Sequence, residues 1–233
     1  MRCDGARWLI GVWLIVGLQA GSLEAQKVSI GAKVGSGQVP LTDWADFFGG
    51  VQYSHYESDR LALYWELFSR LAIADHHIVK LSVERITTSS SLAAVSVFSP
   101  GPGSATSTTE WDFSTVPVSL TYEFHLLGFE AASTPYLGAG FAVYFSDVET
   151  VTRTLYSPDD RVDLLPDSAT RDGEGYGFHG YVGQRTRIND RLSLSAQIRG
   201  RWADGIGFSD DPEDIDVDFT GIDLTVGLEW MFR

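Results

Sequence analysis

Apolar and polar residues alternate with a period of two along most of the chain after Lys27, and this alternation constrains the fold more than any other feature. Successive side chains of a β-strand point to opposite faces, so the pattern predicts strands with one apolar and one polar face. It is clearest in residues 221–232, where Ile222, Leu224, Val226, Leu228, Trp230 and Phe232 share a face. Seven further segments show it, namely residues 28–35, 47–57, 61–71, 116–125, 137–145, 178–188 and 191–202. We therefore predict an all-β fold with eight strands.

The connections between these segments alternate in length. Tight turns are predicted at Ser58-Asp59 and Asn189-Asp190, and a link of about eight residues surrounds Gly128. The remaining links are long and cover residues 36–46, 73–113, 146–174 and 204–216. This alternation predicts an eight-stranded antiparallel up-and-down transmembrane β-barrel with short periplasmic turns and long external loops.

One region fits this scheme poorly. Residues 78–88 and 92–98 also alternate like strands, and Ser89-Ser90-Ser91 separates them. We interpret them as a hairpin within the external loop 73–113. A ten-stranded barrel is the alternative.

Charged residues of both signs, Lys33 among them, lie on the polar faces of the predicted strands together with glycines. The interior of an eight-stranded barrel is filled by side chains, and buried charges must be paired. We therefore predict that the barrel interior contains an ion-pair network and that no wide pore is present. The predicted members are Glu66, Arg70, Glu123, Arg185, Arg187, Arg199, Arg201, Asp223 and Glu229.

The N-terminus has the order of a secretory signal peptide. Arg2 and Arg7 precede an apolar run at residues 8–18, and small and polar residues follow up to Ala25. We predict a cleaved signal peptide at residues 1–25 and a barrel domain at residues 26–233. The only cysteine, Cys3, lies in the leader, so the mature chain is expected to contain no disulfide.

Three segments, at residues 61–70, 115–145 and 221–232, resemble the small outer-membrane β-barrel superfamily, which includes the outer-membrane protein A and W types and the opacity-like porin fold. The resemblance implies a location in the outer membrane of a Gram-negative cell. It also implies that the last strand presents Leu228, Trp230 and Phe232 to the barrel-assembly machinery. Such signals usually end in an aromatic residue, whereas here Arg233 follows Phe232.

Composition and motifs argue against nucleic-acid binding, enzymatic activity and an EF-hand calcium site. A formal charge of -14 disfavours nucleic-acid binding. His125 and Glu123 share a face but are expected to point inward, so we predict no enzymatic activity, and we expect no cofactor. Residues 210–218 are acidic and could bind Ca²⁺, but they lack EF-hand spacing, and a solvated loop is the preferred interpretation.

The predicted function is therefore structural. We expect a monomer that contacts outer-membrane lipid and lipopolysaccharide and displays its loops for surface interactions. A narrow conduit or binder for small solutes is one alternative, and a soluble periplasmic lipocalin-like carrier is another.

Overall fold

The computed structural model describes residues 27–38, 53–58, 61–98, 103–157, 161–162, 167–208, 216–217 and 220–232. The predicted signal peptide, most of the acidic segment 210–218 and part of the loop 36–46 lie outside these residues. The described residues form eleven strands: β1 (Lys27–Gln38), β2 (Tyr53–Ser58), β3 (Leu61–Ala72), β4 (His77–Phe98), β5 (Gly103–His125), β6 (Ser133–Ser157), β7 (Arg161–Val162), β8 (Asp167–Arg187), β9 (Leu192–Phe208), β10 (Asp216–Val217) and β11 (Gly221–Phe232). The described residues contain no helix long and apolar enough to cross a membrane.

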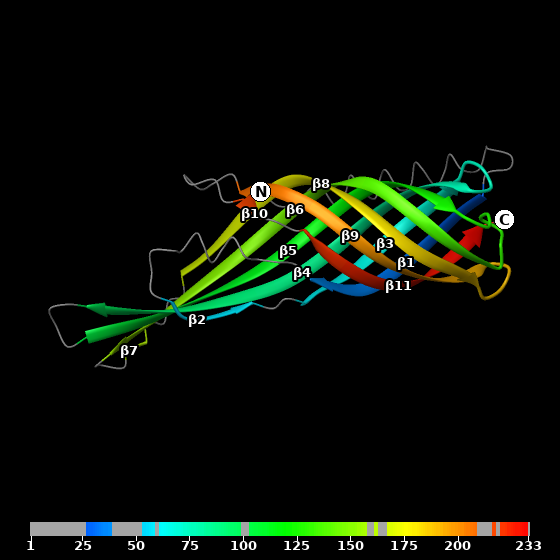
Figure 1. The fold of residues 1–233 in the computed structure, drawn as a ribbon. Helices are drawn as coiled ribbons and strands as arrows, with labels where there is room; N and C mark the ends of the chain where they lie inside the picture. Colours follow the sequence, from blue (N-terminus) through cyan, green and yellow to red (C-terminus); the bar gives the residue numbers. More distant parts are fainter. Residues whose placement is uncertain are drawn as a thin grey trace.

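Eight of these strands pair in a closed antiparallel barrel, whose course can be followed in Figure 1. Their order around the barrel is β1, β3, β4, β5, β6, β8, β9 and β11, and each strand pairs with the next. The pairing of β11 with β1, from Val28 opposite Phe232 to Gly37 opposite Asp223, closes the cylinder. The predicted eight-stranded antiparallel barrel is therefore confirmed.

One of the eight barrel strands was predicted wrongly, although the number of strands was right. Of the predicted strand 47–57, only residues 53–57 are described, and they do not supply a barrel strand, because β2 lies off the barrel path and pairs with the outer part of β4. Residues 78–98 do not form a hairpin in a loop. They belong to β4, a single strand of 22 residues between β3 and β5. Ser89-Ser90-Ser91 is not a turn, because these serines pair with Asp112, Trp111 and Glu110 of β5.

The predicted hairpin turn at Ser58-Asp59 is also wrong, because β2 and β3 each pair with β4 and not with each other. The short connections between barrel strands lie at residues 73–76, which were predicted to belong to a long loop, and at residues 126–132 and 188–191, where short connections were predicted. In the last of these, the Asn189 Oδ1 accepts hydrogen bonds from the backbone N–H groups of Arg191 and Leu192, both at 2.9 Å. This confirms the tight turn predicted at Asn189-Asp190.

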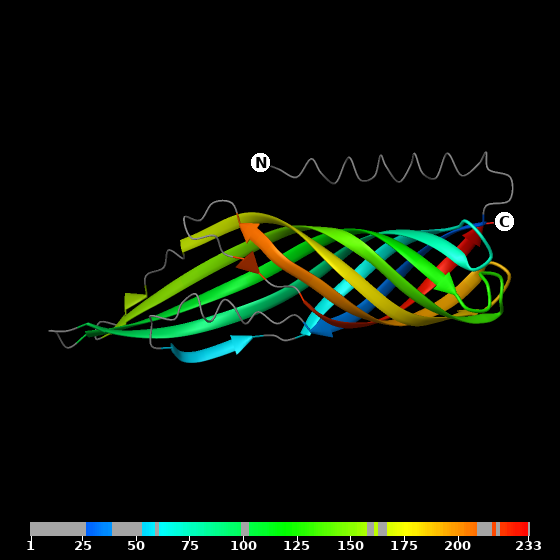
Figure 2. The same cartoon turned by 45° about the horizontal axis from the view of Figure 1, so that its top comes forward.

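Four neighbouring strands are much longer than the others. β4, β5, β6 and β8 contain 22, 23, 25 and 21 residues, whereas β1, β3 and β11 contain 12 each. The longer strands continue as a twisted sheet past the end of the barrel opposite the C-terminus (Figures 1 and 2). Much of the predicted loops 73–113 and 146–174 is therefore paired β-strand. We call the part of this sheet that lies beyond the pairing of β4 with β3 and of β8 with β9 the extension. It comprises residues 88–98, 103–113, 148–157 and 167–172.

The outer surface of the barrel is an apolar belt. Period-two alternation directs one face of every barrel strand outward, and large apolar side chains occupy that face on all eight strands. Their exposure is typically about half, for example 50% for Leu67, 49% for Phe141 and 54% for Ile198. Exposed members include Ile30, Val34, Leu63, Trp65, Leu120, Tyr122, Phe124, Leu137, Phe145, Phe178, Val182, Leu194, Trp202, Leu224, Val226, Leu228, Trp230 and Phe232.

The inner face also contains aromatic rings, each seated over a glycine of the neighbouring strand. Phe68 of β3 lies opposite Gly31 of β1, and a Cβ atom at Gly31 would come within 2.3 Å of the Phe68 ring. Tyr181 of β8 covers Gly138 of β6 in the same way, at 2.3 Å. Glycine at these positions makes room for a large ring inside a narrow cylinder.

Candidate functional site: the charged interior of the barrel

Six cationic side chains and five carboxylates are buried in the barrel interior, among the described residues. The cations are Lys33, Arg70, Lys80, Arg185, Arg199 and Arg201, and the carboxylates are Glu66, Glu84, Glu123, Asp223 and Glu229. They form three clusters along the barrel axis, and the first cluster lies nearest the end that holds the C-terminus.

Arg70 is the centre of the first cluster. Its Nε and Nη2 atoms donate to the two oxygens of Glu123, at 2.7 and 3.0 Å, and its Nη1 donates to Glu229 Oε2 at 2.6 Å. Arg185 Nε also donates to Glu229, at 3.1 Å, and Tyr181 Oη donates to Glu123 Oε1 at 2.5 Å. Because Arg70 and both carboxylates are fully buried, every charge here is neutralised by a direct neighbour and not by water.

Two lysines and one glutamate form the second cluster. Glu66 Oε1 forms an ion pair with the Lys80 ammonium group, and Glu66 Oε2 lies 3.8 Å from the Lys33 ammonium nitrogen. Lys33 also donates to Gln197 Oε1 at 2.5 Å. Its ammonium group lies 4.9 Å from the centre of the Phe68 ring, where the negative ring face adds a weak attraction.

Arg199 organises the third cluster. Its Nη1 and Nη2 atoms donate to the two oxygens of Glu84, at 2.5 and 2.6 Å, and its Nε donates to Asp223 Oδ2 at 3.0 Å. Arg201 Nη2 donates to the other oxygen of Asp223 at 2.7 Å. The fork-shaped guanidinium suits two carboxylates at once, which makes arginine more effective than lysine at this position.

The turn at residues 126–132 covers the interior at the end that holds the C-terminus. Gly128 adopts a φ of 85°, a conformation that favours glycine, and the turn directs Phe129 inward, where it is 2% exposed. Phe129 packs with Ala72, Ile78 and Met231. The Arg185 guanidinium lies 4.4 Å from the Phe129 ring centre and donates to the Phe129 carbonyl at 2.5 Å.

The structure brings eight of the nine predicted network residues together in these clusters. Arg187 is separate: it lies at the barrel end and donates to the backbone carbonyl of Glu130. The three residues of the predicted assembly signal, Leu228, Trp230 and Phe232, are on the outward face and are 50%, 45% and 51% exposed. Their role in assembly stays a prediction.

His125 and Glu123 also lie inside the barrel. Their Nε2 and Oε2 atoms are 3.1 Å apart, and neither residue is exposed. Among the described residues, no group of three or more His, Cys, Asp or Glu side chains is placed to bind a metal ion. The absence of enzymatic activity and of a cofactor stays a prediction.

The network also contains charged residues that the sequence analysis did not propose. Lys80 and Glu84 lie on β4, the strand that was taken for part of a loop, and they supply the partners of Glu66 and Arg199. Their spacing of four residues within an alternating segment was the signal that could have placed both on the inner face.

The fold and the interior together define a class of protein: an eight-stranded antiparallel β-barrel with an apolar exterior and an ion-paired interior. The sequence matches no known family model and no curated protein.

Several solved structures have a similar fold at low sequence identity. The chain is similar to the outer membrane protein OprG from Pseudomonas aeruginosa, with 14% identity, a TM-score of 0.48 and coverage of 89% of this chain and 96% of that one. It is also similar to Neisserial surface protein A, with 13% identity, a TM-score of 0.43 and coverage of 90% and 100%. Ail, the attachment invasion locus protein of Yersinia pestis, gives 10% identity, a TM-score of 0.46 and coverage of 90% and 100%.

Proposed function

We propose that this protein is an integral β-barrel of a bacterial outer membrane with a structural or surface-interaction role, and that its ion-pair network seals the interior. The observation that carries the proposal is the inverted arrangement of side chains. Large apolar groups cover the outside of a closed cylinder, and the charged groups inside it are paired. In water this exterior would be costly, whereas in a bilayer it contacts hydrocarbon.

A closed barrel also satisfies the backbone within the membrane. Each barrel strand pairs on both sides, so no strand edge faces lipid along the belt. The short turns and the C-terminus would lie on the periplasmic side, and the extension would project from the cell surface. A soluble lipid carrier would need the opposite arrangement, with an apolar interior and a polar exterior.

Cell fractionation combined with protease treatment of intact cells tests this proposal. The protein is expected in the outer-membrane fraction, as a folded species whose electrophoretic mobility changes on heating. Trypsin added outside is expected to cleave in the extension, where the Arg153 side chain is 61% exposed, and to leave the barrel strands intact. A processed protein that stays monomeric in water without detergent would contradict the proposal.

A second candidate function, a narrow conduit for small solutes, is favoured by one row of side chains. Along the inner face of β9, Ser193, Ser195, Gln197 and Arg201 each have a buried polar atom without a hydrogen-bond partner in the described structure. The row spans about 26 Å at the rise of an extended strand. Buried water usually satisfies such groups, so a hydrated path could follow this wall.

Conductance in planar bilayers distinguishes a sealed interior from a conduit. If the β9 row conducts, Ser195→Val is expected to lower the single-channel conductance, because valine removes a polar group and adds bulk on the inner face. Ala196→Val is the matched control, because Ala196 is exposed on the outer face of the same strand. Absence of conductance steps in the wild-type protein would exclude the conduit.

A further inference from the structure

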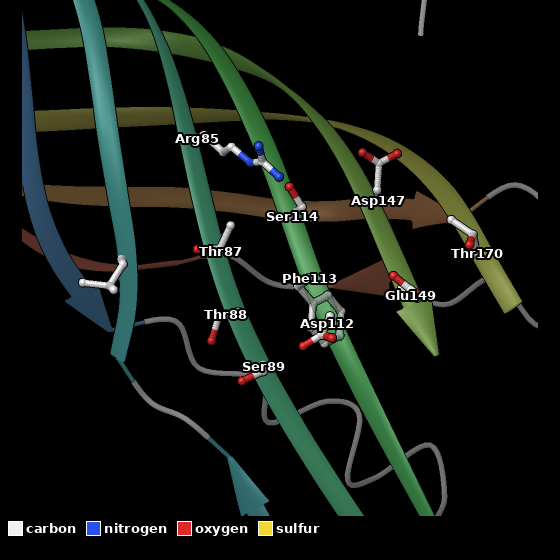
Figure 3. A pocket seen from close by; sticks show the side chains of 11 residues that line it. Arg85, Thr87, Thr88, Ser89, Asp112, Phe113, Ser114, Asp147, Glu149 and Thr170 are labelled. Atoms are coloured by element: carbon white, nitrogen blue, oxygen red, sulfur yellow. The ribbon is translucent and has the colours of Figure 1, made fainter. Parts of the chain in front are cut away.

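The two ends of the barrel interior are closed in different ways. Where the extension begins, side chains of the strands fill the inner face, among them Ile86, Phe113 and Val148, which are 1%, 3% and 1% exposed. Figure 3 shows Phe113 on β5, where it is part of the lining of a surface pocket of about 510 Å³. At the end that holds the C-terminus, the covering ring is Phe129, which belongs to the turn at residues 126–132 and not to a strand. A turn opens at a lower free energy than paired strands do.

Hydrogen bonds from both of its backbone groups anchor Phe129. Its N–H donates to the Asp75 carbonyl at 2.6 Å, and its carbonyl accepts from Arg185 Nη1 at 2.5 Å. Glu130, the next residue, forms an ion pair with Lys27, but these side chains are 62% and 41% exposed, and exposed pairs contribute little to stability. Arg185 is therefore the latch that holds the turn from inside the barrel.

The backbone beside Phe129 has room to move. Gly128 adopts a φ of 85°, and a Cβ atom at this position would have its nearest neighbour, the Asp75 carbonyl oxygen, only in ordinary contact at 3.5 Å. A small pocket of about 20 Å³, whose lining includes Phe129 and Met231, lies next to the ring. It has room for about one water molecule.

The row of polar atoms without partners on β9 begins behind this ring. The Arg185 guanidinium lies 4.4 Å from the Phe129 ring centre, and its Nε donates to Glu229, which lies opposite Ser193 of the row. Ser193 and Ser195 are 0% and 1% exposed, and their hydroxyl groups have no hydrogen-bond partner among the described residues. A buried hydroxyl group without a partner is costly, and water would satisfy it. Water that enters from this end must pass the Phe129 ring.

We propose that Phe129 is a displaceable plug, latched by Arg185, and that its movement admits water and small polar solutes to the β9 row from the end that holds the C-terminus. The inference deepens the second candidate function and rests on the row of polar atoms that carries it. Hydroxyl, amide and guanidinium groups along the row would hydrogen-bond to such solutes.

A static cap is the competing interpretation of the same ring. A static cap would expose the inner face to solution only when the whole barrel unfolds, so every inner position would be reached at the same rate. A plug would open locally, so the inner positions next to it would be reached first.

Cysteine labelling of the full chain in detergent micelles tests the inference. Cys3, the only cysteine of the sequence, is replaced by serine, and one reporter is introduced at a time. The reporters are Ser193→Cys, next to the plug, and Ser119→Cys, which is on the inner face of β5 at a position that is 2% exposed. A small membrane-impermeant methanethiosulfonate reagent is expected to label Ser193→Cys at least about tenfold faster, because local opening costs less than global unfolding. Equal rates would show a static cap and overturn the inference.

Two variants of the turn identify the plug. In the Ser193→Cys chain, Phe129→Ala is expected to raise the labelling rate about tenfold, and Arg185→Gln is expected to raise it less, because the ring remains. The matched control is Leu127→Ala, in the same turn but 65% exposed, and it is expected to leave the rate unchanged. If Phe129→Ala accelerated Ser119→Cys by the same factor, the ring would support the barrel as a whole, and the plug would be excluded.

Conductance in planar bilayers separates the plug from the conduit. If labelling of Ser193→Cys depends on Phe129 but no conductance steps occur, the plug stands, and the row is reached from one end only. If steps occur and are the same in the wild type and in Phe129→Ala, the conduit stands, and the plug is overturned.

Discussion

Arg70→Met is expected to lower the free energy of unfolding by about 3–5 kcal/mol, because it leaves buried carboxylates without their cation. Arg70 makes two hydrogen bonds to Glu123 and one to Glu229, and all three side chains are fully buried. Glu229 keeps Arg185 as a partner, but Glu123 keeps only His125 and Tyr181. Urea titration of the protein refolded in lipid vesicles, followed by the mobility of the folded band, measures the change.

Two further variants separate a lost ion pair from a lost side chain. Arg187→Met removes an arginine that bonds to a backbone carbonyl at the barrel end, and it is expected to cost much less. The double variant Arg70→Met with Glu123→Gln is expected to recover part of the stability, because fewer charges stay buried without a partner. A loss below about 1 kcal/mol for Arg70→Met, the range of an exposed ion pair, would contradict a sealed interior.

Leu120→Arg is expected to destabilise the membrane-inserted barrel by about 2–4 kcal/mol. Leu120 is 43% exposed, and its row on the outer surface continues through Phe141 and Phe178 to Trp202. In a bilayer the new guanidinium would be placed in hydrocarbon, where it loses its hydration. The same urea titration in lipid vesicles measures the effect.

The control for this variant is Gln184→Arg, on the outer face of β8 near the end that holds the short turns. There the guanidinium can reach water, so the cost is expected to be about 0–1 kcal/mol. If Leu120→Arg were no more costly than Gln184→Arg, the belt would face water, and the membrane proposal would fail.

Much of the interior could be predicted from strand periodicity alone. Once an alternating segment is recognised, the face of each residue follows from its number, because the period of a strand is two. Arg70, Arg199 and Asp223 were placed on the inner face in this way, and the structure has them there. Their partners could not be predicted. Arg199 and Glu84 are 115 residues apart in sequence, and periodicity does not encode which strands become neighbours across a barrel.

The course of β4 was decided only by tertiary structure. Ser89-Ser90-Ser91 is typical of a turn when it is read locally, yet these residues continue the strand because β5 pairs with all three of them. β2 shows the opposite case, because a weakly alternating segment was taken as a barrel strand although it pairs only with the outer part of β4.

The sequence by itself determined that the chain forms two-faced strands, that eight of them suffice for a closed barrel, and that charges belong on the inner face. The tertiary structure alone decided that β4, and not β2, supplies the remaining barrel strand, which charges pair, and that Phe129 covers one end. The physical reason is that a side chain's face depends on the backbone of its own strand, whereas pairing depends on the neighbours that closure of the cylinder brings together.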